Sequence, residues 1–258
     1  MRLKDRVAIV TGAAGGLGAA YALAIAREGA QVAVVDLDAA GAHTTAEAVR
    51  ATGVQGRAFG AELGDEAEVA ALVDRVLGEF GRIDIVVNNA GGALPGSTGE
   101  IEKVDRRSWD RVMDMNLTST MLMARAVAPH LKRQRSGKIV NVSSRSARST
   151  GWFSTVSPEY VAAKIGVIAL TRHLAKELGP YGINVNCLVP GFTISGLKLQ
   201  AAWDTMTGEE RQRMLEATPL RRLPRLEELA SVVVFLVSDE SSYVTGAAID
   251  VNGGSFMS

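Results

Sequence analysis

Short apolar runs alternate with longer amphipathic stretches over about the first 90 residues of the chain. The apolar runs have the length of buried strands and lie at residues 6–10, 31–35, 55–60 and 83–88. The stretches between them have helical spacing and lie at 17–28, 38–51 and 66–80. Strands joined by helices form a parallel sheet, because each helix returns the chain to the end where strands begin. The pattern therefore predicts an α/β fold.

The rest of the chain continues this alternation. Further strands are predicted at 138–142, 182–188 and 247–251, and further helices at about 107–132, 158–178 and 226–237. A polar segment at about 192–225 is only weakly helical, and we expect it to cover the substrate. No repeat or linker divides residues 1–258, so the prediction is a single-domain, doubly wound (Rossmann) parallel sheet of about seven strands with helices on both faces. Ligands of such sheets bind at the carboxyl ends of the strands, here near a switch point between strands one and four.

Charge and cysteine content narrow the classes of partner. Lys plus Arg and Asp plus Glu number 28 each, so no net charge attracts nucleic acid or an anionic membrane. No apolar run approaches the roughly 18 residues of a membrane helix. Cys187 is the one cysteine, which fits a reducing compartment, and the three histidines lack metal-ligand spacing. We therefore expect a cytoplasmic protein with a small-molecule partner and no metal, nucleic acid or membrane.

A glycine-rich turn, TGAAGGLG, follows the first predicted strand and contains Gly12, Gly16 and Gly18. Glycines there allow a tight turn and close approach to a pyrophosphate, while the following helix offers free N–H groups to the phosphates. The cluster alone also fits an ordinary strand-to-helix turn. A second observation, at the end of the next strand, favours the dinucleotide interpretation.

Asp36 ends the second predicted strand, 18 residues beyond Gly18. A carboxylate at that place accepts hydrogen bonds from the adenosine ribose and repels the 2′-phosphate of NADP. No Arg or Lys lies at 13–17 or 37–41 to neutralise such a phosphate. The sequence therefore predicts a dinucleotide site that prefers NAD.

Two more loops at carboxyl ends of strands fit the same ligand. NNAGG at 88–92 has small residues that admit the adenine and ribose, and PGFTIS at 190–195 offers a hydroxyl to the carboxamide or phosphates. Either loop is also compatible with a plain turn. The residues predicted to bind the dinucleotide are Gly12, Gly16, Leu17, Gly18, Asp36, Leu37, Glu62, Leu63, Asn89, Ala90, Gly91, Tyr160, Lys164, Pro190, Gly191 and Thr193.

Tyr160 and Lys164 stand one helical turn apart and project from the same face of the predicted helix 158–178. A phenol titrates near pH 10 in water, and a nearby ammonium lowers that pKa toward the range useful for proton transfer. The ammonium is also placed to bind the nicotinamide ribose. Ser143 and Ser144 end strand 138–142, and a hydroxyl there can bind a substrate carbonyl oxygen as it gains negative charge. The spacing allows either serine.

For several other residues the sequence allows two interpretations. Asn116 is a poor helix former inside the predicted helix 107–132, so it has either a backbone or water-holding role or an exposed position. Arg145 and Arg148 are expected to be solvated loop charges rather than an anion site. Apolar side chains in the two segments near the site either line a substrate pocket or pack, and these are Trp152, Phe153, Trp203, Met206 and Met214.

Together TGAAGGLG, NNAG, the asparagine of MDMNLTS, VSS, YVAAK and the loop after PG make residues 4–254 resemble the compact, single-domain branch of the short-chain dehydrogenase/reductase family. The resemblance implies a catalytic tetrad of Asn116, Ser144, Tyr160 and Lys164. In it, Tyr160 exchanges a proton with the substrate oxygen, Lys164 lowers the pKa of the phenol and Asn116 holds a water. It also implies a homotetramer. The expected activity is hydride transfer between NAD(H) and a secondary alcohol or ketone.

The sequence departs from the family pattern at a few positions. Glu62 stands where relatives usually have an Asp that contacts adenine, and Asn252 replaces a commoner Asp. The stretch between Ser144 and Tyr160 is longer than usual, which predicts an enlarged substrate-side loop at 145–157. One alternative activity is a 3-oxoacyl thioester reductase, which normally prefers NADPH and is disfavoured by Asp36. A non-catalytic dinucleotide-binding scaffold is disfavoured because all four tetrad residue types are present.

Overall fold

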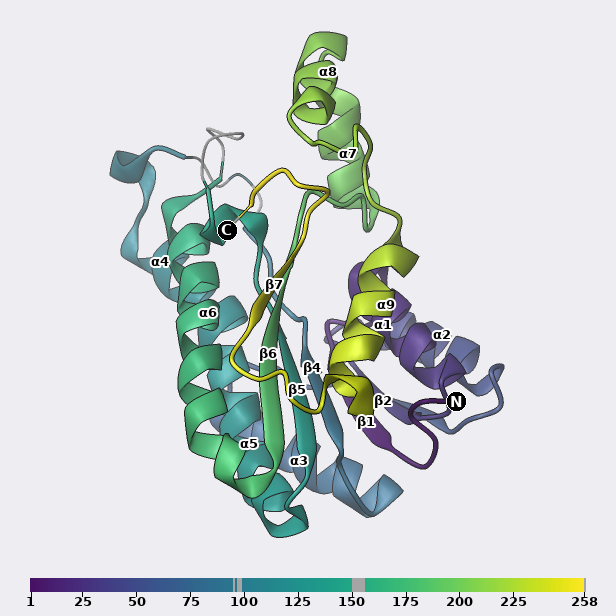
Figure 1. Ribbon diagram of the computed structural model, residues 1–258. Coiled ribbons are helices and arrows are strands. Elements are labelled where there is room, and N and C mark those ends of the chain that lie inside the picture. Colours follow the sequence, from purple (N-terminus) through teal and green to yellow (C-terminus); the bar gives the residue numbers. More distant parts are fainter. Residues whose placement is uncertain (95, 97–98, 150–155, 258) are drawn as a thin grey trace.

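The computed structural model, which describes residues 1–94, 96, 99–149 and 156–257, contains one seven-stranded parallel sheet (Figure 1). Its order is β3-β2-β1-β4-β5-β6-β7, so strands are added toward one edge as far as β3 and toward the other edge from β4 on, which places the switch point between β1 and β4, as predicted. The strands are β1 (Val7–Thr11), β2 (Gln31–Val35), β3 (Gly56–Phe59), β4 (Ile85–Asn88), β5 (Gly137–Val142), β6 (Ile183–Pro190) and β7 (Ala248–Val251). The predicted α/β doubly wound fold is confirmed.

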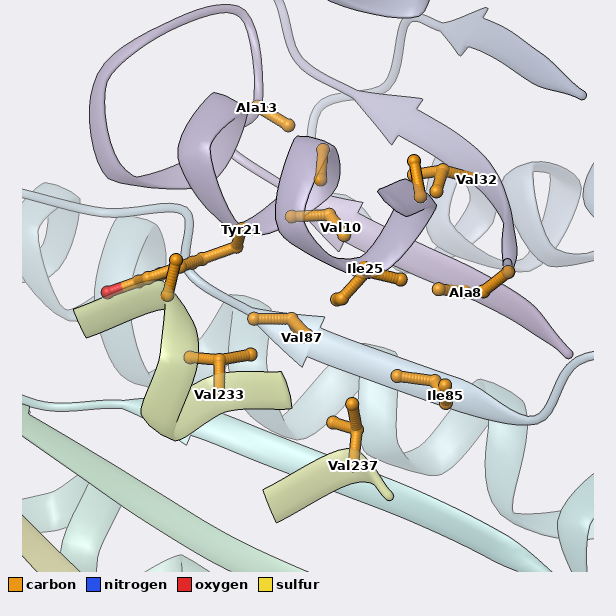
Figure 2. Close-up of a cluster of buried hydrophobic side chains, with 14 of the residues drawn as sticks. Ala8, Val10, Ala13, Tyr21, Ile25, Val32, Ile85, Val87, Val233 and Val237 are labelled. Atoms are coloured by element: carbon orange, nitrogen blue, oxygen red, sulfur yellow. The ribbon is translucent and has the colours of Figure 1, made fainter. Parts of the chain in front are cut away.

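Helices cover both faces of the sheet (Figure 1). One face carries α1 (Gly16–Arg27), α2 (Ala39–Arg50) and α9 (Leu226–Val237). The other carries α3 (Glu66–Phe80), α5 (Ser119–Gln134) and α6 (Pro158–Leu178). Because side chains alternate along a strand, Ala8 and Val10 of β1 enter the first core while Ile9 enters the second. Figure 2 shows the first core, where Tyr21 of α1 and Val233 of α9 meet over Val87.

The helix predicted at 107–132 is instead three consecutive segments. They are α4 (Arg106–Met113), the π-helical turn η2 (Asp114–Thr118) and α5. A π turn widens the helix by one residue, and such turns occur frequently at functional sites. Asn116, the poor helix former singled out in the sequence, lies inside this turn.

The segment predicted as weakly helical contains two short helices, α7 (Leu197–Thr205) and α8 (Gly208–Glu216), which lie beyond the carboxyl end of the sheet (Figure 1). A capping box starts α8: the Thr207 hydroxyl accepts from the Glu210 amide, and the Glu210 carboxylate accepts from the Thr207 amide. The 3₁₀ turns are η1 (Ile101–Lys103), η3 (Arg145–Ala147), η4 (Gly179–Tyr181) and η5 (Asp239–Ser241).

Element ends differ from the predictions by one or two residues. The strand predicted at 182–188 is longer than expected, because β6 continues to Pro190. Its last two residues, Val189 and Pro190, pair with Asp250 and Val251 of β7. Ser157 is the N-cap residue of α6, but its side chain makes no capping hydrogen bond. Trp152, Phe153 and residues 150–155 of the predicted enlarged loop lie outside the described residues. Within the described residues, every helix is too short or too polar to cross a bilayer.

Candidate active site

Tyr160 and Ser144 meet at the carboxyl end of the sheet. Tyr160 lies in the first turn of α6, where Pro158 at the first helical position fixes the start of the helix. Ser144 follows β5, and its hydroxyl lies close enough to that of Tyr160 to act on the pKa of the phenol. Burial raises the pKa of the Tyr160 phenol, and the Ser144 hydroxyl lowers it. The pair can therefore bind one oxygen atom while the phenol exchanges a proton with it.

Lys164 lies one turn after Tyr160 on α6 and is 3% exposed. Its Nζ donates to the carbonyl of Val142 at 2.9 Å and lies 5.8 Å from the centroid of the Tyr160 ring. Burial lowers the pKa of this ammonium to about 8. The hydrogen bond directs the Lys164 ammonium at the end of β5, and its effect on the pKa of Tyr160 stays a prediction.

The two serines after β5 have different surroundings. Ser143 is buried, and its hydroxyl donates to the backbone carbonyl of Lys164 at 2.7 Å. This bond ties the end of β5 to α6 and uses the one hydroxyl proton of Ser143. Ser144 is partly exposed and is the serine beside Tyr160. The sequence allowed either serine to bind the substrate oxygen, and these surroundings favour Ser144.

Asn116 is fully buried, which removes the interpretation of an exposed helix residue. Its side-chain amide donates to the carbonyls of Gly92 and Val112, both at 2.9 Å, and its Oδ1 accepts from the Gly92 amide at 3.0 Å. The side chain thus connects the π turn to the loop after β4. Gly166 of α6 allows close contact here, since a Cβ would lie 2.7 Å from the Leu117 side chain.

The glycine turn after β1 is packed against the loop after β4. The Asn89 side chain donates from its Nδ2 to the carbonyls of Thr11 and Gly12 at 3.0 and 3.1 Å. A Cβ on Gly18 would collide with the Gly12 carbonyl oxygen, and one on Gly12, where φ is +62°, would lie 2.8 Å from Ala90 Cα. These glycines are needed for this close packing.

Asp36 lies beside the same turn, immediately after β2. One of its carboxylate oxygens accepts from the Ala14 amide at 2.9 Å and the other from the Asp38 amide at 3.0 Å. Each carboxylate oxygen accepts more than one hydrogen bond, so capacity remains for a ribose. Gly15 precedes α1 without a side-chain cap, and a Cβ on it would meet nothing within 4 Å. A Cβ on Gly16 would collide with the Ser195 carbonyl oxygen, so the loop after β6 lies directly against the start of α1. The residues therefore fit a dinucleotide held between these two loops, with the uncapped start of α1 toward its phosphates and a carboxylate beside it.

The other residues predicted for the dinucleotide lie along the same edge. Leu37 is 65% exposed beside Asp36, and Leu63 is buried. Glu62 is exposed, and its Oε1 accepts from the Gly64 amide at 3.2 Å. Thr193 is buried, and its hydroxyl donates to the Gly191 carbonyl at 3.0 Å. The remaining positions in these loops and in the first turn of α1 are Gly16, Leu17, Ala90, Gly91 and Pro190.

Three residues were missed or misjudged in the sequence. Thr11 was not selected, yet its hydroxyl accepts from the amides of Asn89 and Ala90, both at 3.0 Å. Its place just before Gly12 was the available indication. Arg145 and Arg148 were expected to be solvated, and this is wrong: Arg145 is 6% exposed, and the Arg148 side chain is 15% exposed and paired with Asp250 at 3.2 Å. They are buried because η3 turns back against β7 after β5.

A family model described as enoyl-(acyl carrier protein) reductase matches residues 12–255. The chain belongs to the short-chain dehydrogenase/reductase family. Cyclohexanol dehydrogenase of Rhodococcus sp. is 39% identical, with 98% of this chain and 96% of that protein covered. A 3-oxoacyl-(acyl-carrier-protein) reductase of Staphylococcus aureus is also 39% identical, over 97% and 98% of the two chains. The crystal structure of levodione reductase superimposes with a TM-score of 0.89 at 31% identity and covers 98% of each chain.

Membership makes this chain an oxidoreductase, and the alcohol or ketone activity predicted from the sequence agrees with its relatives. Short-chain dehydrogenases of this kind use nicotinamide cofactors. The choice of NAD or NADP and the roles of individual residues are finer questions, which depend on the geometry of this chain.

Proposed function

We propose that the protein is an NAD-dependent dehydrogenase of secondary alcohols that also reduces the corresponding ketones. The observation that carries the proposal is that Tyr160 and Ser144 lie together at the carboxyl end of the sheet, with Lys164 one turn along the same helix as Tyr160. The cofactor supplies the hydride acceptor in oxidation and the hydride donor in reduction. Tyr160 would take the hydroxyl proton of the alcohol while the hydrogen on the carbinol carbon leaves as hydride. Ser144 would hold the oxygen of the alcohol during this transfer.

Lys164 and Asn116 support this proton transfer from the protein side. Lys164, whose pKa burial lowers to about 8, is poised to bind the nicotinamide ribose and to hold a proton near Tyr160. Asn116 is a positioning residue, since its side chain is fully used in holding the loop after β4. Its backbone carbonyl lies in the π turn and accepts from the Thr120 hydroxyl at 2.8 Å, and it would hold the water that relays protons outward.

The residues around the glycine turn support NAD over NADP. The Asp36 carboxylate is held in place by two backbone amides, so it cannot swing away from a 2′-phosphate. No Arg or Lys lies at 13–17 or 37–41 to neutralise that phosphate. Binding NADP would therefore bring two negative groups together without compensation. The remaining predicted loop residues, including Thr193, would contact the dinucleotide from the β6 side.

A turnover assay tests the proposal. Linear and cyclic secondary alcohols are incubated with NAD, and NADH is followed by its absorbance. We expect oxidation of at least one alcohol class and a loss of about 10³-fold or more in kcat for Tyr160→Phe, with NADH binding retained. Tyr181→Phe is the matched control, because Tyr181 lies at the opposite end of α6, about 30 Å away by helix rise. NADH binding without any turnover would indicate a scaffold and overturn the proposal.

Reduction of a 3-oxoacyl thioester is a second candidate. The chain is as similar to the staphylococcal 3-oxoacyl-(acyl-carrier-protein) reductase as to cyclohexanol dehydrogenase, at 39% identity to each. Such reductases normally prefer NADPH, which Asp36 disfavours. Faster turnover of an acetoacetyl thioester with NADPH than of any alcohol with NAD would make this the main activity.

We further propose a homotetramer in a reducing compartment such as the cytoplasm. Met121 of α5 and Ile165 of α6 are 38% and 53% exposed, and apolar side chains on neighbouring helices suit burial between subunits. Cys187, the one cysteine, is a free thiol. Residues 192–225, with α7 and α8, would cover the substrate within one domain of residues 1–258. Light scattering on the purified protein gives the subunit number directly.

A further inference from the structure

Arg145 is a buried arginine whose charge has no partner among the residues that the structure describes. It is 6% exposed, and its Nη1 is fully buried without a hydrogen-bond partner. Within residues 1–94, 96, 99–149 and 156–257, no carboxylate forms an ion pair with it. Burial alone lowers its pKa, with no acidic neighbour opposing the effect. A buried charge of this kind is costly in free energy unless something binds it, and such groups are rare outside functional sites.

The nearby Arg148, unlike Arg145, has a charged partner. Arg148 lies three residues further on, and Asp250 accepts from its Nε at 3.3 Å while the Ala248 carbonyl accepts from its Nη2 at 3.1 Å. Both arginines are packed against the sheet, yet only Arg148 has a carboxylate. Burial by the fold therefore does not by itself leave an arginine unpaired in this region.

Arg145 lines a cavity of about 130 Å³. Apolar side chains form much of the wall, including Phe192, Met214 and Leu223. The other charges in the wall already bind one another, since Glu228 accepts from Arg222 at 2.6 and 2.8 Å. Glu228 also accepts from Arg225, which is outside the cavity wall, so its carboxylate is occupied. The cavity therefore presents one unneutralised positive charge in largely apolar surroundings.

The cavity adjoins the proposed reaction site. Arg145 follows Ser144 directly, so their Cα atoms are about 3.8 Å apart. Phe192 belongs to the loop after β6, and Met214 belongs to α8 above the carboxyl end of the sheet. A substrate that binds both sites must therefore reach from Ser144 and Tyr160, which do not line the cavity, to Arg145, which does.

We propose that the substrate is a hydroxy acid, or its oxo acid in reduction, whose carboxylate binds the guanidinium of Arg145. The planar guanidinium matches a carboxylate through two parallel hydrogen bonds, which also fixes the orientation of the substrate. Arg145 is then a specificity-determining residue, and the apolar wall contacts the carbon chain. This inference rests on the proposed alcohol dehydrogenase activity and specifies its substrate class.

The first experiment compares acids with their uncharged isosteres. Linear hydroxy acids with a secondary alcohol, from 3-hydroxybutyrate to 6-hydroxyheptanoate, and cyclic 3-hydroxycyclohexanecarboxylate are each assayed with NAD beside the matching carboxamide. We expect the wild-type protein to prefer at least one acid by 10-fold or more in kcat/KM. Arg145→Met should remove that preference mainly through KM for the acid, while turnover of the amide stays within about threefold.

Two variants separate the subsite from other effects. Arg145→Lys keeps the charge without the planar fork and should restore part of the preference. Arg148→Met removes the same charge three residues away and should affect acid and amide equally. If the wild type does not distinguish acid from amide, or if Arg145→Met slows both equally, the proposal is wrong.

Thermal unfolding provides a readout that does not depend on turnover. Because Arg145 is buried without a partner, replacing it by Met should leave the Tm of the protein alone unchanged or raised. A Tm lowered by several degrees would mean that Arg145 is paired in solution, for example in a second copy of the chain, and would overturn the proposal.

Thermal unfolding also distinguishes a failure of the proposed dehydrogenase activity from a failure of the carboxylate subsite. If NADH binds but no alcohol is oxidised, the proposed activity fails while the subsite can still be tested. Cyclohexanecarboxylate should then raise the Tm of the NADH complex, cyclohexanecarboxamide should not, and Arg145→Met should remove the difference. Equal effects of acid and amide on the wild type would show that the subsite is absent.

Discussion

The two sides of the carboxyl edge of the sheet are built differently. On the side of β1, β2 and β4, loops are held by backbone groups and short polar side chains, and a Cβ on Gly18 would strike the Gly12 carbonyl. On the side of β5, β6 and β7, the edge contains a cavity of about 130 Å³, an unpaired buried arginine and two short helices. The first side suits a ligand that many proteins share, whereas the second is shaped for a particular substrate. Four substitutions test this difference.

The largest effect is expected from Ser144→Ala on the substrate side. Loss of a hydroxyl that holds the reacting oxygen typically lowers kcat by about 10²–10³-fold. Burial raises the pKa of Tyr160 and the Ser144 hydroxyl lowers it, so removing that hydroxyl raises the pKa further. The phenolate needed for oxidation then forms only at higher pH, and the rise of kcat with pH should shift to more alkaline values.

Ser143→Ala is the matched control for this pH profile. Its hydroxyl bonds the Lys164 carbonyl, so the variant should lose some stability but keep the wild-type profile. An alkaline shift in Ser143→Ala and none in Ser144→Ala would contradict the assignment of the serine beside Tyr160.

Gly18→Ala should act on the cofactor side and through stability. A Cβ there would collide with the Gly12 carbonyl and lie 2.7 Å from the Asn89 amide nitrogen, so the turn must move. Such overpacking costs about 2–3 kcal/mol, measurable by urea unfolding without cofactor. Gly15→Ala is the control, because a Cβ at Gly15 meets nothing within 4 Å and its extended backbone suits any residue. Equal stability of the two variants would show that the turn is not closely packed.

Asp36→Asn should change cofactor choice by a smaller amount. The amide oxygen can still accept hydrogen bonds, but the charge that repels a 2′-phosphate is gone. We expect the ratio of kcat/KM for NADP to that for NAD to rise about 10-fold, equivalent to about 1.4 kcal/mol. Asp38→Asn removes the same charge two residues away, at the N-cap of α2, and should leave the ratio unchanged. An unchanged ratio in Asp36→Asn means that another residue selects the cofactor.

The smallest effect is expected from Thr207→Ala at the start of α8. Losing the capping box weakens this helix by about 1 kcal/mol, but α8 lies beyond the sheet. The Tm and the Kd for NADH should therefore barely change, while KM for the alcohol rises up to about threefold. Asp105→Ala removes the N-cap of α4, which packs against α6, and should lower the Tm more. The reverse order would place α8 within the stabilising core.

Parts of the site were predictable because local sequence decides them. Tyr160 and Lys164 share a helix face by spacing alone, and α6 begins and ends where the sequence predicted. Gly12 and Asp36 follow strands whose parallel order brings their loops together. The split of helix 107–132 by a π turn was not predictable, because Asn116 adopts it through bonds to Gly92, 24 residues away in sequence.

The sequence by itself determined the order of strands and helices, the glycine turn beside Asp36 and the pairing of Tyr160 with Lys164, because these depend on periodicity and short spacings. Only the tertiary structure decided which serine meets Tyr160, where the Lys164 ammonium points and that Arg145 is buried without a partner. Each of these depends on contacts between segments distant in the chain, and burial sets the cost of a charge. The sequence of a loop does not show whether its arginine is exposed to water or buried in the protein.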